Sequence, residues 1–205
     1  GDVTHVFRII TTSDNSHDSG LQVKKYRAAK TDFPFILSES AISGDTAQIK
    51  SNGYSLSWGP QKIQKSAINI VKKQNNAVGN DQFLVLTNLT QEVFYPSIYP
   101  DVDLQYIIST TGVKENYVLK NQNAQKEFLI TYKSKGLTAV QYDEKTIDLT
   151  NQSGNIIYRI QAPEMTDSLQ NRSEDVFITL ISQEADSIQV RLTADSQWLG
   201  SSDRK

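Results

Sequence analysis

The segment FYPSIYPDVDLQYIISTTGVKENYVL, from Phe94 to Leu119, decides the fold of this chain. Its central part alternates between apolar and polar residues with a period of two, as a strand with one buried face does. Turn residues follow at 109–112, and a second alternating run returns from there. The apolar-face positions of the two runs are Leu104, Tyr106 and Ile108, then Val113, Glu115, Tyr117 and Leu119. The segment therefore predicts a β-hairpin.

Two prolines, Pro96 and Pro100, lie immediately before this hairpin. Proline fixes φ and has no backbone N–H, so it cannot donate to a sheet ladder from either position. We therefore expect residues 94–100 to run as an extended connection and not as an interior strand.

Polar residues in and beside the hairpin raise the question of their partners. Glu115 falls on the apolar face, where a carboxylate is costly unless it is hydrogen-bonded or paired. We expect it to pair with a cation, with Lys114 and Arg159 as candidates, and we expect Asp103 to accept hydrogen bonds from turn amides. Tyr106 and Tyr117 are predicted to form an aromatic cross-strand pair.

The rest of the chain is a succession of short apolar runs separated by turn residues. Strands at intervals of about 8 to 12 residues, with Gly, Asn, Asp and Ser between them, are typical of an antiparallel sandwich. We predict an all-β fold, mainly an antiparallel β-sandwich of about 14 short strands with little helix. Residues 1–205 are expected to form a single domain, and residues 73–81 are the best candidate for an internal boundary.

Composition restricts the classes of protein to consider. The 205 residues carry 21 basic and 23 acidic side chains, a formal charge of −2, with no run of Lys or Arg, so we expect no nucleic-acid partner. There is no cysteine, which excludes disulfides and thiol chemistry. No apolar run approaches the ~18 residues of a membrane span, and no signal peptide opens the sequence. We expect a soluble piece excised from a longer protein.

The hairpin segment also carries a resemblance. The string from Tyr99 to Tyr106, followed by the string from Gly112 to Leu119, resembles the pattern "YPGVDLxY … GLKExIVL" of a β-rich module in secreted bacterial proteins. These are the wall-associated proteins with RHS (YD) repeats and related surface proteins with DNRLRE domains. Asp101 departs from the pattern, which commonly has glycine there. Further matching positions are Gly136 to Leu137, Ile156 to Pro163, Met165, Asp167, Ser173 to Leu180, Trp198 to Leu199, and Asp203 to Lys205.

The resemblance, over about residues 52–205, implies an extracellular, cell-wall-associated module of a Gram-positive surface protein. It implies a non-catalytic scaffold or interaction role beside carbohydrate-binding-like or RHS-type domains. The implied partners are neighbouring domains of the parent chain, and a polysaccharide or another surface protein is a further candidate.

The sequence contains few residues that are candidates for catalysis. The two histidines are His5 in a predicted strand and His17 in a predicted loop, and no serine stands in a G-x-S-x-G context. The acidic residues with unusual surroundings are Asp101, Asp103, Glu115 and Asp167. Paired carboxylates would suit glycoside hydrolysis, but structural hydrogen bonding is the commoner role. We predict no catalytic residue, no cofactor and no metal, since the loop Asp14 to Asp18 matches no known spacing.

Carbohydrate binding is the alternative function. Exposed aromatic rings on a β-sandwich can stack on sugar faces. The candidate rings are Trp58, Tyr95, Tyr99 and Trp198. Packing inside the module is the competing explanation for each of them.

Overall fold

The computed structural model describes residues 9–12, 25–28, 35–51, 53–70, 83–86, 90–109, 112–161, 163–167 and 169–199. These residues form twenty strands and one four-residue helix, α1 (Ser196–Leu199). The all-β prediction is confirmed. The strands outnumber the predicted 14 or so because short pairings join the longer ones. The two-residue strands are β4 (Ser40–Ala41), β7 (Ser66–Ala67), β8 (Asn69–Ile70), β17 (Met165–Thr166) and β18 (Arg172–Ser173).

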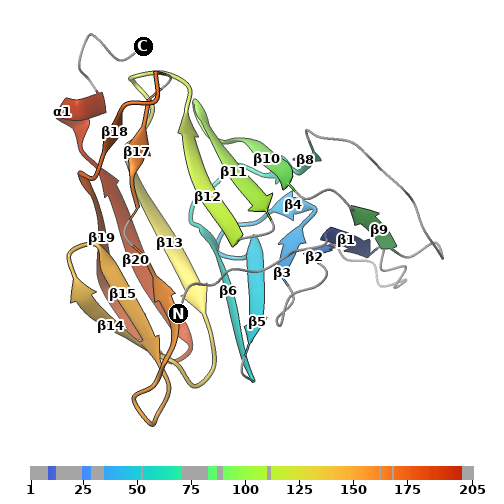
Figure 1. The fold of residues 1–205 in the computed structure, drawn as a ribbon, viewed down its shortest axis with the longest axis vertical. Helices are drawn as coiled ribbons and strands as arrows, with labels where there is room; N and C mark the ends of the chain where they lie inside the picture. Colours follow the sequence, from blue (N-terminus) through green and yellow to red (C-terminus); the bar gives the residue numbers. More distant parts are fainter. Residues whose placement is uncertain are drawn as a thin grey trace.

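A nine-stranded antiparallel sheet, the main sheet, forms one layer of the molecule (Figure 1). Its central ladder pairs Tyr132 with Ile188 on one side and with Trp58 on the other. In spatial order the strands are β19 (Val176–Glu184), β20 (Ser187–Ala194), β13 (Glu127–Lys133), β6 (Tyr54–Pro60), β5 (Ala47–Ser51), β3 (Phe35–Ser38), β2 (Lys25–Ala28), β1 (Ile9–Thr12) and β9 (Phe83–Leu86).

The predicted hairpin is present at the edge of a second sheet, the hairpin sheet. Its order is β12 (Gly112–Leu119), β11 (Val102–Ser109), β10 (Thr90–Tyr99) and β8. The register places Leu104 opposite Tyr117 and Tyr106 opposite Glu115. Val102, Leu104 and Tyr106 are fully buried, so the alternating pattern identified the inward face correctly.

The prediction that residues 94–100 form no interior strand is wrong. Residues 94–99 belong to β10, in which Phe94 pairs with Gln105 of β11 on one side and with Asn69 of β8 on the other. The prolines are tolerated because the ladder is irregular between Tyr95 and Tyr99, where Ser97 has a φ of 52°. Pro96 lies in this bulge and Pro100 in the turn after it, so neither has to donate a ladder hydrogen bond.

A third antiparallel sheet consists of β14 (Thr138–Asp143), β15 (Thr146–Thr150) and β16 (Ile156–Ile160). A side chain joins it to the edge strand β19 of the main sheet. The Gln141 amide donates to the carbonyl of Ile178 at 2.9 Å and accepts from the N–H of Leu180 at 2.7 Å. Gln183 of β19 in turn accepts from the N–H of Ala139 at 2.6 Å. Side-chain amides thus satisfy backbone groups of both β19 and β14 as a neighbouring strand would.

Replacing Gln141 with alanine should therefore lower the free energy of unfolding by about 1 to 3 kcal/mol, because two backbone groups of β19 lose their partner. Urea unfolding followed by circular dichroism measures the change. Gln152, an exposed residue in a turn of the same sheet, provides the matched control. An effect no larger than that of Gln152→Ala would contradict this role of the Gln141 amide.

The hairpin sheet and the third sheet contribute to one hydrophobic cluster with the main sheet. Phe128, Ile130 and Tyr132 of β13 are buried, and they pair across the ladder with Leu192, Val190 and Ile188 of β20. The two smaller sheets supply further fully buried side chains. These include Tyr95, Leu104 and Tyr106 from the hairpin sheet and Ile147 and Leu149 from the third sheet.

Candidate functional site

A carboxyl group between the hairpin sheet and the main sheet is the most unusual feature of the described residues. Glu115 lies on the inward face of β12, opposite Tyr106 of β11. Its Oε2 atom accepts a hydrogen bond of 2.6 Å from Nε1 of Trp58, which belongs to β6 of the main sheet. Its Oε1 atom accepts a weaker one of 3.3 Å from the hydroxyl of Tyr117. One side chain thus joins the two sheets.

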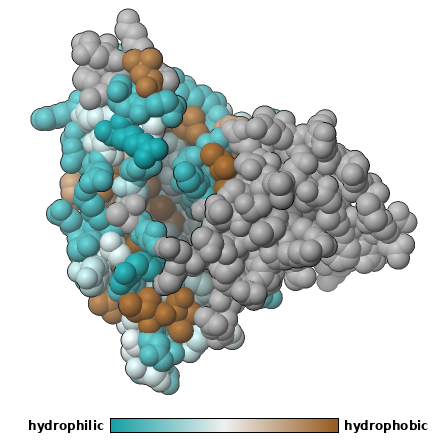
Figure 2. Space-filling view, in the orientation of Figure 1, coloured by the Kyte–Doolittle hydropathy of each residue, from teal (hydrophilic) through white to brown (hydrophobic). Residues whose placement is uncertain are grey.

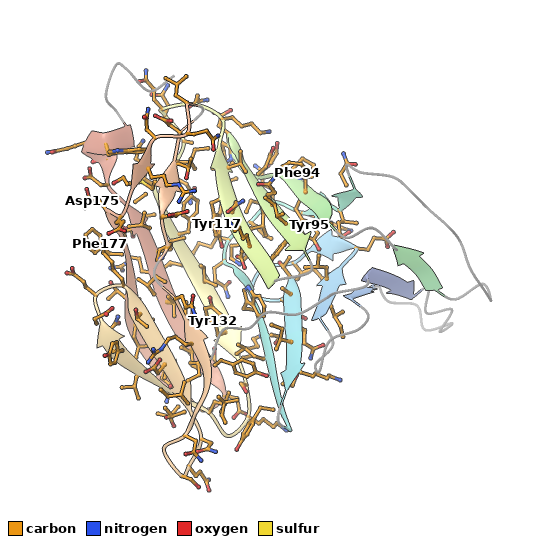
Figure 3. All side chains as sticks on the ribbon, in the orientation of Figure 1. Phe94, Tyr95, Tyr117, Tyr132, Asp175 and Phe177 are labelled. Atoms are coloured by element: carbon orange, nitrogen blue, oxygen red, sulfur yellow. The ribbon has the colours of Figure 1, made fainter. Side chains whose placement is uncertain are left out.

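Aromatic rings from both sheets surround this carboxyl. Trp58 stacks on Tyr132 with ring centroids 6.0 Å apart, and Tyr117 stacks on Phe128 at 4.5 Å. Tyr106 meets Tyr95 edge to face at 6.3 Å. Figure 3 shows Tyr95 and Tyr117 on the hairpin sheet and Tyr132 on the main sheet. Such packing gives the carboxyl a largely apolar setting.

This setting shifts the ionisation of the groups within it. Burial raises the pKa of Glu115 above its ordinary value of 4.5, and this outweighs the lowering by hydrogen bonds from Trp58, Tyr106 and Tyr117. Burial, with the nearby Glu115 carboxylate, also raises the pKa values of Tyr106, Tyr117 and Tyr132 above 10.0. Burial alone raises that of Tyr99 to about 12. The phenols therefore stay neutral at physiological pH.

The predicted ion pair of Glu115 is not formed. Among the described residues, no Lys or Arg makes an ion pair with it. Lys114 is exposed, because the next residue of a strand points to the opposite face. Arg159 instead forms a two-point ion pair with Asp148, at 2.6 and 2.9 Å. An indole and phenols, and not a cation, satisfy the buried carboxyl.

The expected pairing of Tyr106 with Tyr117 needs a similar correction. The two rings are on the same face, but the register places each opposite another residue, Glu115 and Leu104 respectively. Their aromatic partners are Tyr95 and Phe128.

Asp103 holds the bulge that contains Pro96. Its Oδ1 atom accepts from the backbone N–H of Ser97 at 2.7 Å and lies 2.7 Å from Nζ of Lys120. The neighbouring Asp101 has a φ of 59°, the left-handed conformation for which glycine is common, and aspartate tolerates it better than most residues. The backbone carbonyl of Asp101 accepts from the N–H of Lys120 at 2.9 Å. Both aspartates therefore fix the backbone around the turn that connects β10 to β11.

Replacing Asp103 with alanine should lower the free energy of unfolding by about 1 to 3 kcal/mol, because the amide of Ser97 loses its acceptor. Thermal and urea unfolding measure the change. Asp103→Asn keeps an oxygen for that amide and should recover part of the loss. A melting curve identical to that of the wild type would contradict this structural role.

Asp167 closes the turn between β17 and β18. Its Oδ1 atom accepts from the N–H groups of Leu169 and Asn171 at 2.9 and 2.8 Å, and its Oδ2 atom accepts from the side-chain amide of Asn171 at 2.8 Å. These are the contacts of an Asp-initiated turn.

Three of the four candidate sugar-binding rings are buried. Trp58, Tyr95 and Tyr99 expose 9%, 0% and 7% of their surface. The hydroxyl of Tyr95 donates to the carbonyl of Ser38, and that of Tyr99 donates to the carbonyl of Gln61. These rings pack between the sheets, which agrees with the packing explanation and gives no support to the alternative of sugar stacking. The fourth ring, Trp198 in α1, is partly buried.

Some residues considered as candidate metal ligands or catalytic groups lie outside the part of the chain that the structure describes. The Asp14 to Asp18 loop, His5 and His17 lie outside the described ranges. Within those ranges, no cluster of His, Cys, Asp and Glu is placed to hold a metal ion. No helix that the structure describes has the length and apolarity to cross a membrane.

The contact between Trp58 and Glu115 was not predicted, because 57 residues separate the two in sequence. Two signals were present. Glu115 stood out as a carboxylate on an apolar face, and Trp58 shares an inward strand face with Leu56. Periodicity identified the inward face of the hairpin, but it does not say which face of another sheet meets it.

The fold and the site together define an antiparallel β protein whose sheets are joined through a carboxyl within an aromatic cluster. The chain is 30% identical over 122 residues to the tRNA nuclease WapA of Bacillus subtilis (strain 168). It is 26% identical over 128 residues to the Wall-associated protein of Geobacillus stearothermophilus. These matches cover 56% and 62% of this chain, but 5% and 47% of the relatives. No family model and no solved structure matches the chain.

The names of the relatives support one prediction and overturn another. The Geobacillus relative is named for its association with the wall, which supports the expected cell-wall-associated location. The prediction of a non-enzyme is contradicted, because the relatives from Bacillus subtilis and Bacillus spizizenii are named as tRNA nucleases. None of the names mentions RHS or YD repeats, DNRLRE domains or carbohydrate binding, so these stay predictions.

Proposed function

We propose that this chain is a β-sandwich module of a large cell-wall-associated protein and that it packs against neighbouring parts of the parent chain. The observation that carries the proposal is the match to wall-associated relatives. The matched region is 5% of the length of the Bacillus subtilis relative, as expected for one module among many.

The surface of the third sheet supports an interaction role. Val140, Tyr142 and Ile156 expose 48%, 66% and 52% of their surface on β14 and β16. The guanidinium of Arg159 lies 5.0 Å from the centre of the Tyr142 ring. Figure 2 shows an apolar band low on the left, where Figure 1 has β14 and β15. Exposed apolar groups of this kind are common where one domain meets another.

Cell fractionation tests the proposal. An antibody raised against the purified chain would be applied to culture medium, lysozyme-released wall material, membranes and cytosol of the organism that encodes it. We expect the parent protein in the wall fraction. Detection in the cytosol alone, with a cytosolic marker as control, would contradict the proposal. Mixing the purified chain with isolated walls would then show whether the chain itself binds them.

Cleavage of tRNA is a second candidate function, supported by the names of three relatives. Incubation of the purified chain with total bacterial tRNA tests it directly. Discrete fragments produced by the folded chain, and absent after heat denaturation, would place the activity in this module. Intact tRNA would contradict this candidate function for the module.

A further inference from the structure

We propose that Glu115 is a proton-dependent latch: a carboxyl held between the hairpin sheet and the main sheet without a cation, whose protonation makes the joined fold more stable in acid and less stable as pH rises. The latch is independent of the proposed function. It rests on the position of one carboxyl group and on the chemistry of the groups that face it.

The carboxyl is placed to act on both sheets. Its backbone belongs to β12, whereas its shortest hydrogen bond, of 2.6 Å, comes from the Trp58 indole of β6. Trp58 is itself fixed, since its carbonyl accepts from the N–H of Thr46 at 2.8 Å and its ring stacks on Tyr132. A change at the carboxyl therefore acts directly on the contact between two firmly held elements.

Among the described groups that face this junction, Glu115 is the acid that loses its proton at the lowest pH, because the others are phenols and an indole. The indole of Trp58 faces it from β6, and phenols face it from β11, β12 and β13. These phenols belong to Tyr106, Tyr117 and Tyr132, and their raised pKa values keep them neutral below about pH 9. Two further phenols come from β10: Tyr95 raises the pKa of Tyr106, and Tyr99 raises the pKa of Tyr117. Among the described residues, no cation pairs with the carboxyl.

The direction of the effect follows from proton linkage. In the unfolded chain Glu115 loses its proton near pH 4.5, whereas burial raises the pKa in the folded chain. Between these two values the folded protein holds a proton that the unfolded chain has released. The stabilisation is therefore complete below pH 4.5 and is lost as pH rises through the folded pKa. Within this window the folding equilibrium constant falls about tenfold per pH unit relative to a chain without the carboxyl.

Comparison of the wild type with Glu115→Gln tests the latch. Glutamine keeps the shape and the acceptor oxygen of the protonated acid but does not titrate. Urea unfolding at a series of pH values from 4 to 8 should show the wild type losing stability relative to Glu115→Gln as pH rises. Glu184→Gln, a change at an exposed position of β19, is the matched control and should follow the wild type. Parallel curves for the wild type and Glu115→Gln would overturn the proposal.

Two direct readouts complete the test. In a Trp198→Phe background, Trp58 is the sole indole, and its emission should change with pH in a transition that Glu115→Gln abolishes. The side-chain carboxyl of Glu115, followed by NMR in 13C-glutamate-labelled protein, should titrate with a midpoint above 4.5. This measurement needs no variant to fold. A midpoint at or below 4.5, or Trp58 emission that does not change with pH, would overturn the latch.

Discussion

Trp58→Ala should lower the free energy of unfolding by about 3 to 5 kcal/mol, the range typical for removal of a large buried ring. Two losses add. The alanine leaves a cavity against Tyr132, on which the indole stacks, and it removes the 2.6 Å hydrogen bond to Glu115. A buried carboxyl that loses its shortest hydrogen bond is costly in itself. Urea unfolding followed by far-UV circular dichroism measures the change.

Two further variants separate these losses. Trp58→Phe keeps most of the ring volume but removes the donor, so it should cost about 1 to 3 kcal/mol. Trp198→Ala removes a partly buried indole far along the chain and should cost less than Trp58→Ala. Adding Glu115→Gln to Trp58→Phe should reduce the loss, because the carboxyl that lacks its donor is gone. Equal effects of Trp58→Ala and Trp198→Ala would contradict the central role of Trp58.

Local periodicity accounts for what the sequence predicted correctly. The alternation from Leu104 to Leu119 identified the inward faces of β11 and β12, but the expected register was shifted, because Tyr106 lies opposite Glu115 and not opposite Tyr117. The same alternation placed Glu115 among apolar neighbours. In both cases the alternation of apolar and polar residues and the strand face that it predicts lie within a few residues of each other, so one sequence is enough to make the prediction.

The failed predictions involve contacts between distant segments. The cation expected beside Glu115 is replaced by Trp58 of another sheet, and Arg159 pairs with Asp148 of the adjacent strand. The extended connection expected at residues 94–100 is instead largely strand, with Pro96 in a bulge where the Ser97 amide donates to Asp103. A bulge depends on the partner strand, and a cross-sheet hydrogen bond depends on how two sheets stack. Neither is encoded in a local pattern.

The single-domain prediction depends on whether the two smaller sheets unfold together with the main sheet. Leu104 of the hairpin sheet and Leu149 of the third sheet are both fully buried, and they belong to one cluster. Each change to alanine should lower the free energy of unfolding by about 2 to 5 kcal/mol through lost burial and a residual cavity. Val140→Ala, at a position 48% exposed on β14, is the control and should change it by less than about 0.5 kcal/mol.

The shape of the transition is more informative than the size of the loss. If the three sheets form one cooperative unit, Leu104→Ala and Leu149→Ala each shift a single transition, and tyrosine fluorescence and circular dichroism give the same midpoint. If the third sheet folds separately, Leu149→Ala shifts one transition and leaves another in place. We expect the single transition, because the Gln141 amide and the buried Leu149 both join the third sheet to the rest of the fold. Two separable transitions would divide the chain into two domains and would place Glu115 and its rings in only one of them.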